Sequence, residues 1–290
     1  MSTKHPIISV TGSSGAGTTT VKSTFDQIFR REGVKAVAIE GDAFHRYNRA
    51  EMKDELRKRL EAGDETFSHF SFEANALDEL QRVFSDYSKT GTGHTRHYIH
   101  DEEEAEKFGT PPGHFTDWEE LEPGSDLLFY EGLHGAVVND EVNLAKLADL
   151  KVGVVPVINL EWIQKIHRDK NMRGYSTEAV TDVILRRMHA YVHCICPQFV
   201  ETDVNFQRVP VVDTSNPFCA RWIPTADESL VVIRFKNPRG IDFSYLTSMI
   251  QNSWMSRANS IVIPGGKLDL AMQLIFTPMV ERLVSDSRRA

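Results

Sequence analysis

Residues 9–20 read SVTGSSGAGTTT, a glycine-rich stretch between an apolar run and a segment with helical periodicity. The preceding IISVT, which begins after Pro6, predicts a short buried strand, and the apolar spacing of TTTVKSTFDQIFRR predicts a helix over residues 18–31. Glycines at a strand-to-helix turn let backbone N–H groups close around phosphate oxygens, and the helix N-terminus favours anions. The stretch therefore predicts a phosphate-binding loop.

The loop departs from the pattern GxxxxGK[ST] at one position, where Thr18 replaces the expected lysine. The following Thr19 supplies the hydroxyl that is predicted to bind Mg²⁺. A tight structural turn is the alternative for this loop taken by itself. The residues predicted to bind the nucleotide are Gly12, Ser13, Ser14, Gly15, Ala16, Gly17, Thr18, Thr19 and Thr20.

The same alternation of apolar runs and helical spacing continues along the chain. Strands are predicted at residues 34–40, 125–132, 149–159, 209–214, 229–236 and 259–265, and helices at residues 50–63, 160–172, 177–193 and 268–284. Continuous apolar strands are buried on both faces, which favours an α/β fold with a mostly parallel sheet and helices on both faces. Pro278 is expected to bend or interrupt the last helix.

The whole chain, residues 1–290, is predicted to form a single domain, because no repeat, low-complexity tract or linker divides it. Residues 88–125 are rich in Gly, Pro and charge, and predict a long excursion from the core. Residues 165–195 are expected to form a lid-like helical region.

Composition limits the possible partners and the location. The 33 Lys and Arg against 41 Asp and Glu give a net charge of -8, which argues against general nucleic-acid binding. Three cysteines without a CxxC pair indicate a reduced intracellular protein. With no leader sequence and no apolar run of about 18 residues, the expectation is a cytoplasmic protein without a membrane segment.

Two acidic residues follow predicted strands. In EGDAFHR, Asp42 comes just after a strand and is predicted to accept a proton from a substrate hydroxyl, with a helix N-cap as the alternative. His45, Arg46 and Arg49 follow within two turns and are candidates for a substrate phosphate. In FYEGLHG, Glu131 ends an apolar strand and is a candidate Mg²⁺ ligand, with a capping or salt-bridged carboxylate as the alternative.

The segment LEWIQKIHRDKNMRG offers a replacement for the missing loop lysine. Lys165, Arg168 and Asp169 fall at i, i+3 and i+4 on one helix face, with Arg173 one turn further. A surface ion-pair network is the ordinary interpretation of such a cluster. A phosphoryl-transfer site without a loop lysine still needs positive charge at the phosphates, so Lys165 is the candidate cation. Arg186 and Arg187, in the next helix, are candidates to close over the nucleotide, with a position on the surface as the equal alternative.

Taken together, GSSGAGTTT, EGDAFHR, FYEGLHG and IHRDKNMRG resemble the proteobacterial phosphoribulokinases. The resemblance extends over nearly the whole chain through TRHYIH, FTDW, RRMHAYVHCICPQF and VDTSNPF. These enzymes are similar in turn to uridine and pantothenate kinases, which share the P-loop kinase core. The resemblance implies ATP- and Mg²⁺-dependent phosphorylation of the C1 hydroxyl of D-ribulose 5-phosphate, giving ribulose 1,5-bisphosphate and ADP in the Calvin cycle.

The resemblance also implies roles for single residues. Asp42 becomes the catalytic base, Glu131 and Asp169 take metal and catalytic roles, and Lys165 contacts the nucleotide phosphates. The implied sugar-phosphate contacts are His45, Arg49, Arg168 and Arg173, with Arg31, Tyr98 and His100 as weaker correspondences. A homo-oligomer, typically an octamer, activated by NADH and inhibited by AMP, is implied as well, with Arg234 and Arg257 as effector contacts.

Two loop positions differ from the redox-regulated chloroplast relatives, which carry a lysine where this chain has Thr18 and a cysteine where it has Ala16. Ala16 removes thiol control at the loop and favours control by metabolites. Two other functions remain open from the sequence. They are another P-loop small-molecule kinase, such as a uridine kinase, and a non-catalytic ATP-binding sensor.

Overall fold

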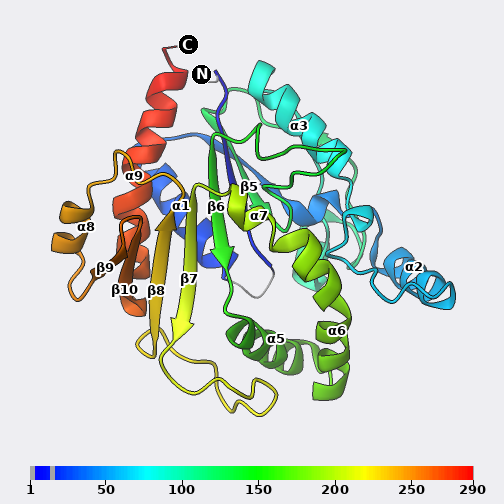
Figure 1. The fold of residues 1–290 in the computed structure, drawn as a ribbon. Helices are drawn as coiled ribbons and strands as arrows, with labels where there is room; N and C mark the ends of the chain where they lie inside the picture. The colour runs from blue at the N-terminus through cyan, green and yellow to red at the C-terminus, as the bar shows by residue number, and fades with distance from the viewer. Residues whose placement is uncertain (1–3, 14–16, 290) are drawn as a thin grey trace.

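The computed structural model describes residues 4–13 and 17–289, apart from the side chains of Thr19, Met172 and Arg173. In this part of the chain the main sheet has eight strands (Figure 1). Their spatial order is β2 (Ala36–Glu40), β5 (Leu127–Gly132), β1 (Ile7–Thr11), β6 (Leu150–Val155), β7 (Val204–Pro210), β8 (Ser229–Phe235), β10 (Ser260–Pro264) and β9 (Trp254–Arg257).

The sheet combines a parallel half with an antiparallel extension. The five strands from β2 to β7 run parallel, and β8, β10 and β9 add to them in antiparallel pairs. Buried apolar runs such as LLFY of β5 are typical of strands covered on both faces. The predicted mostly parallel α/β sheet is therefore confirmed.

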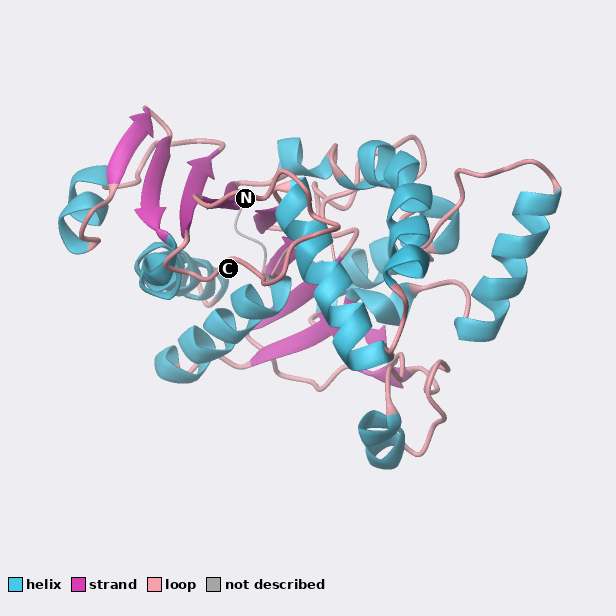
Figure 2. Cartoon of the chain, turned by 90° about the horizontal axis from the view of Figure 1, so that it is seen from below, coloured by secondary structure: helices cyan, strands magenta, loops and turns pink. Residues whose placement is uncertain are grey.

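Helices cover both faces of the sheet, as predicted. Helices α1 and α9 share one apolar cluster with one face, and α3 shares a second cluster with the other face, an arrangement visible in Figures 1 and 2. The helices are α1 (Thr18–Glu32), α2 (Arg49–Glu61), α3 (Leu77–Thr90), α4 (Glu102–Phe108), α5 (Ile158–Arg173), α6 (Thr177–Ala190), α7 (Gln198–Glu201), α8 (Phe243–Met249) and α9 (Leu268–Ser287).

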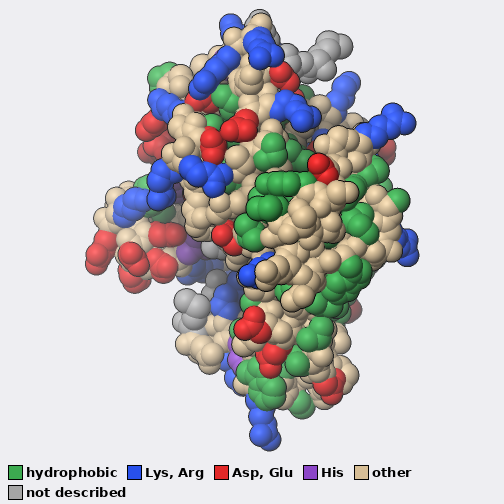
Figure 3. Space-filling view, turned by 90° about the vertical axis from the view of Figure 1, so that its left-hand side faces the viewer, with side chains coloured by type: hydrophobic (Ala, Val, Ile, Leu, Met, Phe, Trp, Pro, Cys, Tyr) green, Lys and Arg blue, Asp and Glu red, His purple; other side chains and the backbone are tan. Residues whose placement is uncertain are grey.

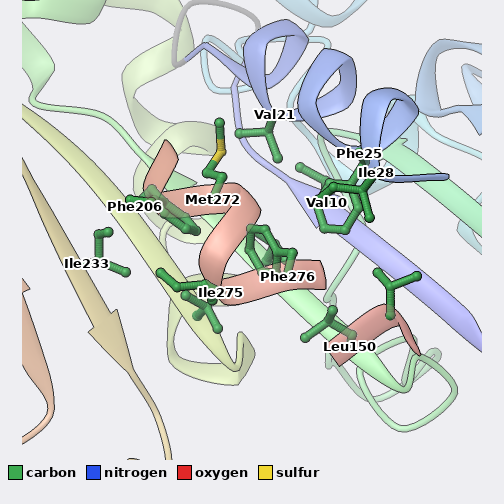
Figure 4. Packing of buried hydrophobic residues seen from close by; sticks show 14 of the residues in the cluster. Val10, Val21, Phe25, Ile28, Leu150, Phe206, Ile233, Met272, Ile275 and Phe276 are labelled. Atoms are coloured by element: carbon green, nitrogen blue, oxygen red, sulfur yellow. The ribbon is translucent and has the colours of Figure 1, made fainter. Parts of the chain in front are cut away.

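The larger cluster locks the C-terminal helix against the helix that follows the phosphate loop. Phe25 of α1 and Phe276 of α9 lie 4.7 Å apart between ring centroids, and both are fully buried (Figure 4). At one end of this contact, Thr24 donates a hydrogen bond of 2.9 Å to Asp269. Because α9 also packs on the buried residues of β8 and β10, it connects the antiparallel half of the sheet with α1.

One predicted strand lies elsewhere, and one expected interruption of a helix is absent. The strand expected at residues 209–214 lies earlier, as β7, because Val204 and Phe206 are its buried apolar positions and Pro210 ends it. Pro278 does not interrupt α9, which continues to Ser287, and a bend there remains a prediction. A proline costs one backbone hydrogen bond, and the buried apolar residues on both sides of it hold the two halves of the helix on the sheet.

The expected excursion at residues 88–125 begins as the last turn of α3, a helix that was not predicted. Beyond it, β3 (His94–Thr95) pairs with β4 (Glu119–Glu120), and α4 lies between them. Backbone bonds such as Ile99 N–H to His114 O, at 2.9 Å, close this segment on itself. Hereafter residues 91–126 are called the β3–β4 segment.

The contact between α1 and α9 predicts a large effect on stability. We expect Phe276→Ala to lower the free energy of unfolding by about 3–5 kcal/mol, because it leaves a cavity among buried aromatic rings. The control is Leu270→Ala on the same helix, where the side chain is exposed and the cost is about 0.5 kcal/mol. Urea unfolding at equal protein concentration measures both, and equal effects would contradict the packing described.

Candidate active site

Four structural segments meet at the edge where the parallel strands end. β1 leads into the phosphate loop, β2 into a single 3₁₀ turn (η1, Gly41–Phe44), β5 into the residues after Glu131, and β6 into α5. Within the sheet, Glu131 pairs in register with Val10 of β1 and with Glu40 of β2. Ligands of open α/β sheets bind at such an edge, so the geometry favours a site there.

The described part of the phosphate loop lies between β1 and α1, as the sequence predicts. Gly17 adopts a left-handed conformation with φ 99° and stands at the N-cap of α1, and Thr18 behind it is buried. Thr20 lies exposed in the first turn. The predictions on Ser14, Gly15 and Ala16, and on the side chains of Thr19 and Arg173, lie outside the described residues.

A backbone contact between two glycines holds the ends of β2 and β5 together. A Cβ atom on Gly41 would lie 2.7 Å from the Cα of Gly132, and one on Gly132 would lie 2.6 Å from the Cα of Gly41. No side chain fits in that space. The contact draws Asp42, which follows Gly41, toward Glu131, which precedes Gly132.

Two histidines hold the two carboxylate oxygens of Asp42. His45 Nε2 lies 3.1 Å from Oδ1, and His100 Nε2 lies 3.4 Å from Oδ2. Burial by itself disfavours the charged carboxylate, but the interactions with His45 and His100 outweigh it and hold the pKa of Asp42 at about 2. Asp42 is therefore ionised at neutral pH.

The predicted residues Tyr98 and Arg49 lie beside this group. The ring of Tyr98 is 6.1 Å from that of His45 and 5.0 Å from that of His100. Arg49, the first residue of α2, donates through Nη2 to the His100 carbonyl at 2.9 Å. The β3–β4 segment thus delivers Tyr98 and His100 to the same place as Asp42.

Arg96 of the β3–β4 segment was not among the predicted site residues, although it lies in the conspicuous TRHYIH motif. Its Nε and Nη2 donate to the carbonyls of Ala43 and His45, both at 2.8 Å. Its guanidinium carbon lies 3.7 Å from the ring centroid of Phe115 and 4.5 Å from that of Trp118. Arg96 therefore clamps the η1 turn, and the FTDW motif supplies its aromatic support.

His69 also joins the site without having been predicted. Its Nδ1 lies 3.3 Å from Nη2 of Arg187, which comes from α6. Burial, followed by the charge of Arg187, lowers the pKa of His69 to about 3, so the ring is neutral. The contact places the predicted residue Arg187 next to the group around Asp42.

Three of the predicted lid residues form an ion-pair cluster on α5. Lys165 Nζ lies 2.6 Å from Asp169 Oδ2, and Arg168 Nε lies 3.2 Å from Asp169 Oδ1. The Asp169 carboxylate is buried. Burial and the neighbouring Arg187 lower the pKa of Lys165, although the bond to Asp169 opposes this effect.

A buried carboxylate connects α5 with the phosphate loop. The Ser13 hydroxyl donates to Glu161 Oε1, and both residues are buried. Burial raises the pKa of Glu161, while the bond from Ser13 and the charge of Lys165 oppose that rise. Lys165 therefore lies within electrostatic range of a residue that touches the loop. Glu161 carries no motif that would have marked it in the sequence.

The acidic groups at this edge fit a magnesium ion. Burial raises the pKa of Glu131, a hydrogen bond with Thr18 opposes the rise, and the Asp42 carboxylate adds to it. A divalent cation bound by Glu131 relieves the repulsion between these two carboxylates. The described residues hold no group of three or more metal-binding side chains. Mg²⁺ needs none, because in kinases one or two carboxylates and the substrate phosphates bind it.

Three arginines lie away from this group. Arg31, near the C-terminal end of α1, donates to Gln273 (2.6 Å) and Thr277 (2.6 Å) of α9, so the structure does not place it beside Asp42. Arg234 of β8 and Arg257 of β9 both lie opposite Ser260 of the intervening β10. They therefore sit together in the antiparallel half of the sheet.

The fold, in which the loop after β1 leads into α1 at this strand edge, is that of a P-loop kinase. The model of the phosphoribulokinase / uridine kinase family matches residues 7–215. The chain therefore belongs to the phosphoribulokinase / uridine kinase family, and membership of this kinase family implies the use of ATP and Mg²⁺.

The most informative relatives match over their full length. The chain is 77% identical over 290 residues to phosphoribulokinase 1 of Cereibacter sphaeroides, covering 100% of both chains. It is 70% identical over 287 residues to the phosphoribulokinase of Nitrobacter vulgaris, covering 99% of each. The solved structure of phosphoribulokinase from Rhodobacter spheroides is similar with a TM-score of 0.91 at 74% identity, covering 99% of this chain and 100% of that one.

No helix within the described residues is long and apolar enough to cross a membrane.

The ion pair between Asp42 and His45 predicts a pH window of added stability. Burial lowers the pKa of His45, but the effect of Asp42 and Asn75 is larger and raises the pKa above its ordinary value of 6.5. Its contribution is therefore present below about pH 6.5 and is lost as pH rises through the raised value. The pKa of Asp42 is depressed to about 2, so its contribution is present above about pH 4 and is lost as pH falls toward 2.

We therefore expect the difference in unfolding free energy between the unsubstituted protein and Asp42→Asn to be largest between about pH 4 and 6.5. Urea unfolding at a series of pH values measures it. A difference that stays constant across the series would show that the pair does not form.

Proposed function

We propose that this protein is a kinase that transfers the γ-phosphate of ATP to the C1 hydroxyl of D-ribulose 5-phosphate, a step of the Calvin cycle. The observation that carries the chemistry is the Asp42 carboxylate, held by His45 and His100 at the strand edge that also bears the phosphate loop. The acceptor is taken from the phosphoribulokinases that match the full chain.

In the proposed reaction, ATP lies over residues 12–20, whose backbone N–H groups and helix N-terminus face its phosphates. Thr19, Glu131 and Asp169 would hold Mg²⁺, which when bound neutralises charge on the transferring phosphoryl group. Asp42 takes the proton of the attacking hydroxyl. His45, Arg49, Arg168 and Arg173 hold the sugar phosphate, with Tyr98 and His100 beside them.

Lys165 is proposed to replace the missing loop lysine. Two observations support this role, the burial of Lys165 next to Arg187 and its electrostatic contact with Glu161, to which the loop residue Ser13 donates. Its bond to Asp169 keeps the ammonium group in place until the phosphates arrive. An ammonium group removed from bulk water acts more strongly on phosphate charge than one at the surface.

We further propose a homo-oligomer, in the form of an octamer, with NADH as activator and AMP as inhibitor. The edge strand β9 supports an association of copies, because Trp254 and Met255 are exposed there, with Tyr245 and Met249 of the neighbouring α8. Figure 3 faces this side of the molecule and shows hydrophobic side chains gathered on it. The neighbouring Arg234 and Arg257 suit an anionic effector. A cytoplasmic location remains a prediction.

The acceptor is the first property to test. We expect ADP release that depends on ribulose 5-phosphate, rises with NADH and falls with AMP, and we expect none with uridine. A coupled assay for ADP measures each case. Release with uridine alone would make the protein a nucleoside kinase, and ATP binding without any ADP release would make it a sensor.

Two substitutions separate the base from the phosphate-binding cation. We expect Asp42→Ala to lower kcat about 10²–10⁴-fold with little change in either KM, because it removes a proton acceptor. We expect Lys165→Met to lower kcat by about 10²–10³-fold and to raise the KM for ATP, because it removes charge from the phosphates.

Lys170→Met is the matched control, since Lys170 is exposed on the same helix. Steady-state kinetics with both substrates varied gives all the constants. If Lys165→Met behaves like the control, another residue supplies the cation, and an unaltered kcat in Asp42→Ala would remove Asp42 from the mechanism.

A further inference from the structure

Asn75 lies directly beneath His45 and has one possible amide orientation. It follows the short turn η2 (Phe72–Ala74), is 2% exposed, and forms an isolated antiparallel bridge with His45. Its Nδ2 lies 3.0 Å from the His69 carbonyl and 2.8 Å from the Ser71 carbonyl. Only the amide nitrogen can donate to carbonyls, so Oδ1 must point the other way, where His45 Nδ1 lies at 2.9 Å.

A buried histidine also lies against this amide. His134 Nε2 lies 3.2 Å from Asn75 Nδ2, its Nδ1 lies 3.3 Å from Gln198 Nε2, and the residue is 2% exposed. Burial lowers the pKa of His134 to about 3, so the ring is neutral. The orientation of Asn75 follows from the two carbonyls, because with the amide turned over Oδ1 would face two oxygens that only accept.

This orientation settles the protons on His45. Because Oδ1 of Asn75 can only accept, Nδ1 of His45 carries a proton. The other nitrogen, Nε2, faces the Asp42 carboxylate at 3.1 Å, and an ionised carboxylate also only accepts. Both ring nitrogens therefore carry protons, and His45 is an imidazolium ion.

The groups around His45 come from four segments. Among the described residues, the structure places the anion Asp42 of η1 beside it, together with the side chains of His69, of Tyr98 and His100 in the β3–β4 segment, and of Arg187 in α6. Burial and the Arg187 charge oppose protonation of His45, while Asp42 and the bond to Asn75 favour it. Without Asn75, Asp42 alone opposes the effects of burial and Arg187.

We propose that Asn75 is a positioning residue which, by accepting from Nδ1, keeps His45 doubly protonated so that its Nε2–H orients the Asp42 carboxylate. A neutral His45 with its proton on Nδ1 turns the Nε2 lone pair toward Asp42 and repels it. Asn75 itself touches neither substrate. The effect of this arrangement on the reaction rests on the proposed function, but the protonation of His45 does not.

Two substitutions at Asn75 have opposite consequences. Asn75→Leu removes the acceptor, so the pKa of His45 should fall by about one unit or more. In Asn75→Asp, the new carboxyl group can carry one proton on the oxygen that faces the two carbonyls. Its other oxygen then still accepts a hydrogen bond from His45. The pKa of His45 should then stay at its original value or rise.

The direct measurement is the ¹⁵N spectrum of protein labelled at its histidines, recorded in the solid state over a pH series without substrate, with His45→Gln identifying the resonances. Two protonated nitrogens on His45 near pH 6, together with a His45 pKa that falls in Asn75→Leu and does not fall in Asn75→Asp, support the proposal. An unprotonated Nδ1 in the unsubstituted protein overturns it, even where neither variant folds. A His45 pKa that Asn75→Leu leaves unchanged also overturns it.

Kinetics provide the second readout. The alkaline limb of the profile of kcat/KM for ribulose 5-phosphate against pH should move down by about one unit in Asn75→Leu and stay in place in Asn75→Asp. A uniform loss in both variants with no movement of the limb would reduce Asn75 to a structural role. If the unsubstituted protein forms no ADP from ribulose 5-phosphate, the proposed function fails, while the ring-nitrogen result still decides the role of Asn75.

Discussion

The parallel pairing of β2, β5 and β1 is the constraint on which the site depends. Strands that run in the same direction and in register must end at the same edge, so the phosphate loop, Glu131 and Asp42 meet there without any loop having to reach across. The contact between Gly41 and Gly132 tightens this arrangement to backbone distance. The spacing between the phosphate loop and Asp42 is therefore set by the sheet itself.

Charge at this edge is distributed between two groups of cations. On the side of the loop, α5 brings Lys165 and Arg168, which Asp169 holds in a buried cluster. On the side of Asp42, the side chains that contact the carboxylate are histidines, His45 and His100. A histidine can be neutral or charged according to its neighbours, and here His69 is neutral while His45 is charged. In the proposed reaction, this arrangement offers charge to an anionic sugar phosphate through histidines, and the groups that contact the Asp42 carboxylate are not permanent cations.

The sequence predicted the parts of this arrangement that have a local signature. The apolar runs of β1, β2 and β5 and the periodicity of α1 predicted the parallel sheet and placed Gly12, Asp42 and Glu131 at strand ends. The roles of the individual site residues remain predictions. Arg96 and Asn75 were missed because their contacts join segments that are about 30 to 50 residues apart, and no spacing along the chain reveals such a contact. Arg31 was expected near the substrate by resemblance, yet its guanidinium bonds to Glu32 of its own helix and to Gln273 and Thr277 of α9.

The two histidines on Asp42 affect the timing of the proposed transfer. A carboxylate made so acidic has little affinity for a proton, so the sugar hydroxyl keeps its hydrogen until its oxygen has begun to bond to phosphorus and has become acidic itself. Phosphoryl transfer through a loose transition state asks little nucleophilic strength of the attacking oxygen. In the proposed reaction, the bond between the phosphorus and ADP therefore breaks first, and the proton moves to Asp42 late. Asp42 then acts through its orientation toward the hydroxyl rather than through its basicity.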